Sequence, residues 1–284
     1  MFKHNPTPAA IFLTSIATSA IAGETTVVDF SNGDGGWAGP AGPGGYTEID
    51  HEDGNPLPSM RTVFNDFGIT FLNDTNPAWI RSYAGLGPVT FSIDTRVINI
   101  SFFDSPVTRP WLIELRDFDS AQGGFPWAGV WFKFADISAQ QYPDWTTFSV
   151  TIENPDSETL PDGWRGFGAE DPVTFEPILP PGVTFADILA GVDQVVYTTL
   201  EPGFFFGFTD HEIAIDNITI TTQSLGCNPA DIAEPFGVLD LADISAFIQA
   251  FITHDPAADI APPGGVFDLA DLSAFIQAFT AGCP

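Results

Sequence analysis

Aspartates recur at matching positions in two nearly identical stretches near the C-terminus. The first stretch is DIAEPFGVLDLAD, residues 231–243, and the second is DIAPPGGVFDLAD, residues 259–271. Carboxylate oxygens are the ligands that Ca²⁺ prefers, and a loop that runs into a helix can present several of them to one ion. The sequence therefore predicts a calcium loop in each stretch. The candidate ligands are Asp231, Asp240 and Asp243 in the first loop and Asp259, Asp268 and Asp271 in the second.

The same aspartates also suit a role that needs no metal. Asp240 stands directly before an apolar run of helical period, and Asp243 lies three residues later. Aspartate is favoured at both positions because its carboxylate accepts hydrogen bonds from the free N–H groups of a first helical turn. Asp268 and Asp271 are placed in the same way in the second copy. The sequence leaves both interpretations open.

Apolar residues at helical spacing follow each acidic stretch and predict two amphipathic helices. The stripes consist of Leu241, Ile244, Phe247, Ile248 and Phe251 in the first copy and Leu269, Leu272, Phe275, Ile276 and Phe279 in the second. A helix of about eleven residues is marginally stable alone, so we expect the two stripes to be buried against each other.

The segment 227–284 resembles a dockerin with a cysteine at each end, the GC type of exported planctomycete-type bacterial proteins. The resemblance rests on the duplicated DLADxSAFIQAF and on the flanking CNPAD and AGCP. It implies a calcium cofactor, a cohesin-like partner module, and anchoring or assembly as the function. The docking residues that it implies follow the ninth ligand position, at Leu241, Ala242, Leu269 and Ala270. A helical hairpin without a partner is the alternative.

Both loops depart from the dockerin pattern. They contain thirteen residues, and their third and fifth ligand places hold neither a carboxylate nor an amide. In the second copy, Pro262 and Pro263 stand there instead. Gly237 and Gly265 keep the residue type that a sharp turn requires.

The N-terminus has the features of a secretory signal peptide, residues 1–22. A short polar start with Lys3 precedes an apolar run over residues 9–22, which ends in the small-x-small sequence AIA. We therefore expect a secreted, extracellular protein, free or associated with the cell surface. Cys227 and Cys283 then favour a disulfide, because exported chains keep their cysteines oxidised. We expect no membrane span, since no later segment is apolar for long enough.

The net charge excludes two classes of partner. The chain has 37 acidic and 8 basic residues, a formal net charge of -29 at pH 7. Such an acidic protein repels phosphate backbones and anionic headgroups, so we expect no binding to nucleic acid or to anionic membranes. With 44% hydrophobic and 13% aromatic residues, the chain has enough apolar side chains to fold.

Residues 24–222 form a different region, with many short β-branched or alternating runs separated by Gly, Pro, Asn and Asp clusters. Short strands between turn signals predict an antiparallel β-sandwich of the jelly-roll type. Only residues 184–192 look helical there. The predicted fold class is mainly β: a sandwich over residues 24–222, followed by a small all-α loop-helix repeat over residues 227–284.

The β region resembles the jelly-roll domains of the laminin-B and carbohydrate-binding-module kind. The resemblance rests on GDGGW (33–37), WIRSYAGLGPVTFSI (79–93), DGWRGF (162–167) and, near the end, FADILAGVDQVVY and IAIDNITI. It implies that the first and last strands lie together and share a structural calcium, for which Asp29 and Asp216 are the candidates. It also implies that the sandwich binds a glycan, such as a polysaccharide.

Four tryptophans are candidates for glycan binding, because a sugar ring packs its apolar face on an exposed indole. They stand in Gly-, Pro- or Asn-rich stretches, at Trp37, Trp79, Trp127 and Trp164. Trp111, Trp131 and Trp145 stand in strand-like runs and are expected in the core. Burial of the first four in the core is the alternative.

A catalytic alternative rests on Glu48, Asp50 and Glu52. They match the E-x-D-x-E pattern of laminarinase-like retaining glycosidases, where alternate residues of a strand place two carboxylates at the scissile bond. The neighbouring Gly- and Pro-rich sequences indicate a loop, so we assign no catalytic residue. We expect a secreted non-catalytic protein. A polysaccharide hydrolase or lyase, or a purely structural surface component, are the alternatives.

Overall fold

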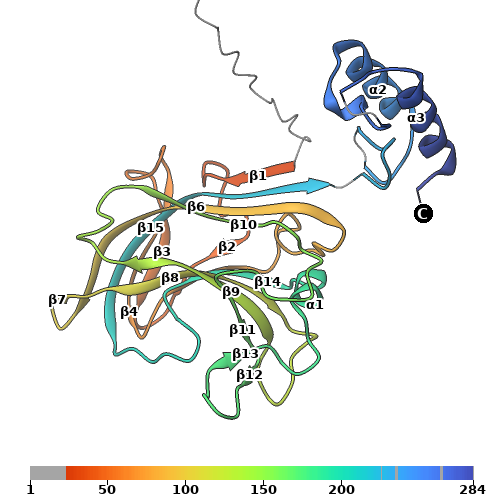
Figure 1. Ribbon diagram of the computed structural model, residues 1–284. Helices are drawn as coiled ribbons and strands as arrows, with labels where there is room; N and C mark the ends of the chain where they lie inside the picture. Colours follow the sequence, from red (N-terminus) through yellow and green to blue (C-terminus); the bar gives the residue numbers. More distant parts are fainter. Residues whose placement is uncertain (1–23, 225, 234–235, 263–264, 284) are drawn as a thin grey trace, which may run out of the picture. The chain divides into compact units, whose positions relative to one another are not determined.

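The computed structural model describes residues 24–224, 226–233, 236–262 and 265–283 of the chain. The predicted signal peptide, residues 1–22, lies outside the described residues. Those residues fall into two compact units, one within Gly23–Leu225 and the other within Gly226–Pro284 (Figure 1). We call them the sandwich and the helical unit.

The sandwich is built from antiparallel sheets, which confirms the predicted fold class. Its first sheet has seven strands: β1 (Glu24–Val28), β3 (Gly45–Asp50), β4 (Ser59–Asp66), β6 (Leu86–Phe102), β7 (Ser105–Pro106), β10 (Thr146–Ile152) and β15 (Thr209–Ser224). Its second sheet has six: β2 (Trp37–Ala38), β5 (Thr70–Asn73), β8 (Arg109–Asp117), β9 (Ala128–Ile137), β11 (Trp164–Phe167) and β14 (Gln194–Thr198). The short strands β12 (Ala169–Glu170) and β13 (Pro177–Ile178) pair with each other, and α1 (Phe185–Ala190) precedes β14.

Strand order places the two longest strands at the centre of the first sheet, which runs β10-β6-β15-β4-β3. β1 pairs with the end of β15, and β7 pairs with β6. The second sheet runs β11-β9-β8-β14-β5-β2. The ladder between β6 and β15 shifts register after Asp216, and Asn217 there has a φ of 46°. This bulge begins at a buried carboxylate, Asp216.

The core lies between the two sheets, because alternate residues of each strand point to opposite faces. Phe91 and Ile93 of β6 face Ile113 of β8 and Val195 of β14 in one buried cluster. The predicted helix near residues 184–192 is confirmed as α1. It begins at Thr184, whose side chain accepts a hydrogen bond from the N–H of the third helical residue.

The helical unit contains α2 (Leu241–Thr253), a 3₁₀ turn (Pro256–Ala258) and α3 (Leu269–Ala281). The rings of Phe247 and Phe275 stack with their centroids 4.0 Å apart and form its centre. Its fully buried apolar residues are few: Ala230, Phe247, Ala258 and Phe275. The predicted disulfide is present, joining Cys227 to Cys283 with their Cα atoms 5.4 Å apart. A cross-link suits so small a core, because it restricts the unfolded chain.

Among the described residues, no helix is both long enough and apolar enough to cross a membrane.

Candidate functional site

The two helices of the helical unit leave an apolar groove open to solvent. Its volume is about 250 Å³. The lining comes from both helices: Ile244, Phe247, Ile248, Leu272, Phe275, Ile276, Phe279 and Thr280. Most of these positions occur as pairs 28 residues apart, so each copy of the repeat supplies one wall of the groove.

The groove corrects the expectation that the two apolar stripes bury each other. Ile248 and Ile276 are both 52% exposed, whereas Phe247 and Phe275 are almost fully buried. An apolar stripe on a helix spans about 100°, and one neighbouring helix covers only part of it. The stacked phenylalanines hold the helices together, and the isoleucines one residue further round remain accessible.

The predicted docking residues lie beside this groove and do not line it. Leu241 and Leu269, in the first turns of α2 and α3, are 74% and 76% exposed. Ala242 and Ala270 donate their N–H groups to the aspartates that begin the helices. Sequence reasoning missed the groove because it assigned its residues to the core. The sequence does contain an indication of the groove: each helix has an apolar stripe that is wider than the surface one neighbouring helix can cover.

The acidic loop before α2 is closed by a buried carboxylate. Asp243 Oδ1 accepts hydrogen bonds from the N–H groups of Ile232 and Ala233, each at 2.9 Å. Asp243 Oδ2 accepts another from the N–H of Asp240 at 2.9 Å. Asp240 in turn accepts the N–H of Ala242. The interpretation of this pair as N-cap and third-residue carboxylates is confirmed.

The second loop repeats this arrangement. Asp271 Oδ1 accepts the N–H of Ala261 at 2.9 Å, and Oδ2 accepts the N–H of Asp268 at 3.0 Å. The hydrogen bond from Asp268, followed by that from Ala261, lowers the pKa of Asp271 below its ordinary value. Asp268 begins α3 as the N-cap, as predicted in the interpretation without a metal.

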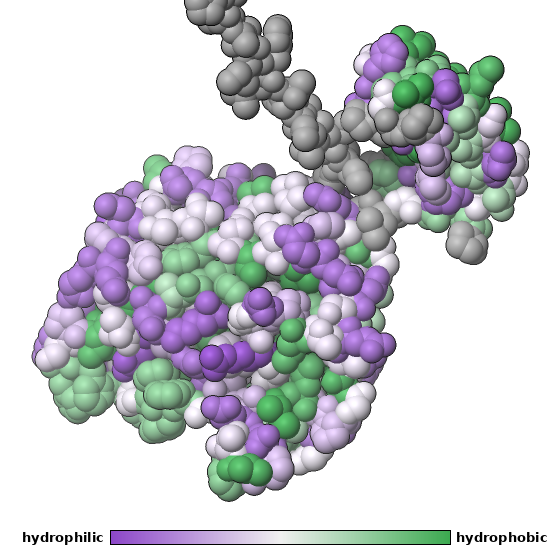
Figure 2. Space-filling view, viewed as in Figure 1, coloured by the Kyte–Doolittle hydropathy of each residue, from purple (hydrophilic) through white to green (hydrophobic). Residues whose placement is uncertain are grey.

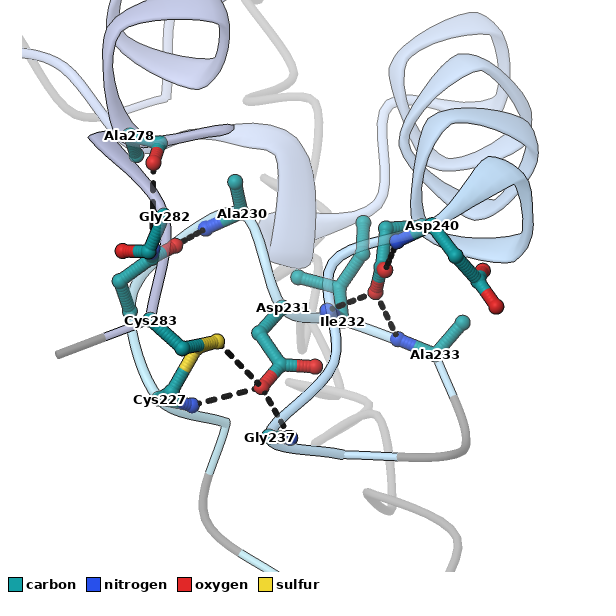
Figure 3. Close-up of a disulfide and its surroundings, with 12 residues drawn as sticks. Cys227, Ala230, Asp231, Ile232, Ala233, Gly237, Asp240, Ala278, Gly282 and Cys283 are labelled. Carbon is teal, nitrogen blue, oxygen red and sulfur yellow. Dashed lines mark hydrogen bonds between the residues drawn. A yellow bond between two sulfur atoms is a disulfide. The ribbon is translucent and has the colours of Figure 1, made fainter. Parts of the chain in front are cut away.

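The first aspartate of each loop holds its sharp turn. Asp231 Oδ2 accepts the N–H groups of Cys227 at 2.7 Å and of Gly237 at 2.6 Å (Figure 3). Asp259 Oδ2 accepts the N–H of Gly265 in the same way. The two glycines have φ angles of 85° and 84°, which favour glycine at both positions.

Calcium in the two loops stays a prediction: a calcium cage needs six to eight oxygens, and residues 234–235 and 263–264 of the loops lie outside the described residues. One oxygen in each loop, Oδ1 of Asp231 and of Asp259, is buried without a hydrogen-bond partner among the described residues. Asp243 and Asp271 have both carboxylate oxygens bonded to backbone N–H groups. Across the described part of the chain, the one cluster with three close potential ligands is Cys227, Asp231 and Cys283, and its sulfurs form the disulfide.

In the sandwich, the first and last strands lie together as expected, with Val28 opposite Ile218. The carboxylate of Asp216 accepts the N–H groups of Asn55 at 2.6 Å and of Asn217 at 2.7 Å. Burial, with the nearby charges of Asp94 and Asp29, raises the pKa of Asp216 to about 6.

The other proposed ligand of that calcium, Asp29, is engaged locally. Its carboxylate accepts two hydrogen bonds from Ser31, and the one from the Ser31 hydroxyl contributes most to the lowering of its pKa. Asp29 and Asp216 belong to no cluster of three close potential ligands among the described residues. A calcium shared by Asp29 and Asp216 stays a prediction.

Three of the four predicted glycan-binding tryptophans are buried, which corrects that expectation. Trp37 is 2% exposed, Trp79 0% and Trp164 5%, and their rings pack inside the sandwich. The Gly- and Pro-rich flanks describe the backbone and do not decide which way an indole points. Trp127 is half-buried: the Arg116 guanidinium lies 3.9 Å above its ring. These four side chains form no exposed platform.

Two of the three acidic residues of the catalytic alternative, Glu48 and Asp50, lie on a strand at the edge of a sheet. β3 is an edge strand that ends at Asp50, so Glu52 lies in the following turn and not on the strand. Asp50 pairs with Arg61 at 3.3 Å and accepts the N–H of Glu52. Glu48 is exposed, beside Arg61 of the neighbouring strand. The geometry does not set Glu48 and Glu52 across a cleft.

An exposed aromatic cluster was missed by sequence reasoning. We call it the Phe patch; it consists of Phe67, Phe102, Phe103, Phe204, Phe205, Phe206 and Phe208. Figure 2 shows hydrophobic side chains gathered at the end of the sandwich where Figure 1 labels β7, at the lower left of the view. The signal was FFFGF, residues 204–208, a run without the alternation that would bury it in a sheet.

No protein-family model matches the sequence, and no curated protein does. Solved structures with some likeness include a family 11 carbohydrate-binding module from Clostridium thermocellum, in complex with a mixed-linked tetrasaccharide. It is 14% identical with a TM-score of 0.41, over 71% of this chain and 96% of that one. The xylan-binding domain of Paenibacillus barcinonensis Xyn10C is 12% identical with a TM-score of 0.40, over 73% of this chain and 100% of that one. At these values neither structure assigns a ligand to this chain.

Proposed function

We propose that this is a secreted, non-catalytic docking protein. Its dockerin-like helical unit binds a cohesin-like module, and its sandwich is the part that the docked protein presents to a glycan. The groove between α2 and α3 is the observation that carries the docking role. An exposed apolar groove in so small a unit is a typical binding surface, because water-exposed Ile and Leu gain free energy when a partner covers them.

The repeat explains the form of the groove. Ile248 and Ile276 are equivalent positions and have the same exposure, 52%. Leu241 and Leu269 extend the apolar surface from the first turns of the two helices. Because the two copies are nearly identical, a partner with an apolar ridge would contact similar residues in either of two orientations. The near-identity of the copies therefore supports docking through this groove.

The proposal is tested with the full chain and a panel of recombinant cohesin-like modules in a calorimetric titration. We expect wild-type protein to bind at least one module. Ile248→Asp with Ile276→Asp should weaken binding at least tenfold, because each charge would be desolvated in the interface. Gln249→Asp with Gln277→Asp is the matched control, on exposed neighbours that do not line the groove.

Two outcomes would count against docking through the groove. Equal loss of binding in the Gln pair would mean that added negative charge, and not the apolar surface, sets the affinity. Unchanged binding in the Ile pair would place the interface elsewhere, for example on Leu241 and Leu269 alone. If no module binds wild-type protein, the helical hairpin without a partner becomes the better description.

A further inference from the structure

Three separate segments of the sandwich bring their phenylalanines together in the Phe patch. Phe67 follows β4, Phe102 ends β6 and Phe103 begins the turn to β7, and residues 204–208 lie in the connection from β14 to β15. The Phe67 ring centroid lies 4.1 Å from that of Phe208 and 4.9 Å from that of Phe205. The aromatic cluster is therefore made by the fold and not by one local run.

Further contacts hold the end of β6 and the connection 204–208 in place. Phe102 packs against Gly207 so closely that a Cβ there would lie 2.7 Å from the Phe102 ring. Phe206 lies below the Arg109 guanidinium, 4.7 Å from it. Packing and a cation–π contact thus hold the rings of Phe102 and Phe206 in position.

Despite this support, the outer rings face solvent. Phe103 is 84% exposed, Phe205 80% and Phe204 67%. Phe103 and the adjacent Asp104 have φ angles of 48° and 59°, a region that costs free energy for residues other than glycine. An exposed apolar cluster presented on a strained turn is typical of a binding site.

Charge around the Phe patch narrows the class of ligand. Asp66, Asp104, Glu201 and Asp210 stand within or beside its three segments, which contain no Lys or Arg. Arg109, which contacts the Phe206 ring, is buried, so it adds little positive charge to the exposed surface. Lys133 nearby is paired with Glu201 at 3.1 Å. Anionic lipids are repelled by this rim, and so is a second copy of a chain with a net charge of -29. The rim favours a ligand that donates hydrogen bonds and carries no negative charge.

We propose that the Phe patch binds neutral polysaccharide, with sugar rings stacked on the exposed phenylalanines and sugar hydroxyls donating to the surrounding carboxylates. Such a chain offers both apolar C–H faces and hydroxyl donors, which match aromatic rings and an acidic rim. This inference rests on the glycan-presenting role proposed above for the sandwich, and it names the site and the ligand class.

The test is a depletion assay of the full chain on microcrystalline cellulose and on chitin. Wild-type protein should be retained by at least one of them. The triple variant Phe103→Ser, Phe204→Ser, Phe205→Ser should lower the bound-to-free ratio at least tenfold. Phe175→Ser is the matched control: Phe175 is 73% exposed and has a φ of 61°, but lies in the turn between β12 and β13. Tryptophan fluorescence checks that each variant is folded.

The outcomes separate this inference from the proposed function. If wild-type protein is retained and the triple variant is retained equally, the Phe patch is not the site, although glycan binding stands. If neither polymer retains wild-type protein, both the patch and the glycan-presenting role are refuted, and docking is judged by its own titration. Binding to phosphatidylcholine vesicles that is lost in the triple variant would overturn the inference in favour of a lipid surface. Dimerisation lost in that variant would overturn it in favour of a second copy.

Discussion

Two buried groups on β15 give the sandwich opposing responses to pH. Burial, with the charge of nearby Arg109, lowers the pKa of His211 from 6.5 to about 4. Burial, with the charges of Asp94 and Asp29, raises the pKa of Asp216 from 3.8 to about 6. Both side chains are almost inaccessible, at 1% and 0% exposure. Their titrations therefore act on folding in the same pH window.

The two effects have opposite signs. Between pH 6.5 and about 4, unfolded chains protonate His211 and the folded state does not, so acidification lowers the free energy of unfolding. Between about pH 6 and 3.8, the folded state protonates Asp216 and unfolded chains do not, so acidification raises it. At 1.36 kcal/mol per pH unit, each effect amounts to about 3 kcal/mol when complete. Wild-type stability should therefore change little across this window.

Replacing His211 and Asp216 one at a time separates their two contributions to the pH dependence of the free energy of unfolding. Acidification from pH 7 to pH 4 should stabilise His211→Gln by about 3 kcal/mol and destabilise Asp216→Asn by a similar amount. Urea unfolding followed by tryptophan fluorescence reports the sandwich alone, because all seven tryptophans lie between residues 37 and 164. His51→Gln, at an exposed position, is the control and should follow wild type.

The comparison is of slopes and not of absolute stabilities, so a constant cost of either replacement does not affect it. Parallel pH profiles for His211→Gln and Asp216→Asn would refute the reasoning. A steep wild-type profile would also refute the cancellation, although each single effect could then still be measured.

Three predictions concern the helical unit and are measured by circular dichroism at 222 nm. Replacing Cys227 and Cys283 together with Ser should lower its free energy of unfolding by about 4 kcal/mol, since the disulfide closes a loop with a sequence separation of 56; an unchanged melting curve would contradict this. Asp243→Ala should cost about 2–3 kcal/mol, because it removes the acceptor of three backbone N–H groups; Gln249→Ala is the exposed control. If calcium binds the loops, through the buried and unpartnered Oδ1 atoms of Asp231 and Asp259, it should raise the melting temperature of the helical unit; an unchanged melting temperature with calcium and with chelator would refute the predicted calcium loops.

Much of the architecture follows from local patterns. Alternation and turn signals predict the sandwich, and the 28-residue repeat predicts α2 and α3 with their aspartate caps. The residues before each helix were harder, because the same carboxylate can bind a cation or a backbone N–H. Asp243 accepts backbone hydrogen bonds because the loop folds back and brings the N–H groups of Ile232 and Ala233 close to its carboxylate. That path of the chain is tertiary information.

The side-chain errors share one physical cause. A Gly- and Pro-rich flank indicates an irregular backbone, yet it does not decide whether an aromatic ring points inward. Trp79 fills the core from such a stretch, while Phe205 faces solvent from another. Burial depends on which segments pack against the ring, and Phe205 stays 80% exposed although the Phe67 ring lies beside it. Sequence therefore predicted which regions carry aromatic side chains and misjudged which of them are exposed.

Some of the positions that are identical in the two copies are needed for packing, and others are not. Stacking of Phe247 on Phe275 and closure of each loop by a buried aspartate account for conserved spacing between the copies. Neither explains why Ile248 and Ile276 are both isoleucine, since each is half exposed and a polar residue would serve the fold there equally well. An apolar residue kept at both exposed positions is explained if a partner covers them. The identity of the two exposed walls, more than that of the two helices, is thus the part of the repeat that supports docking.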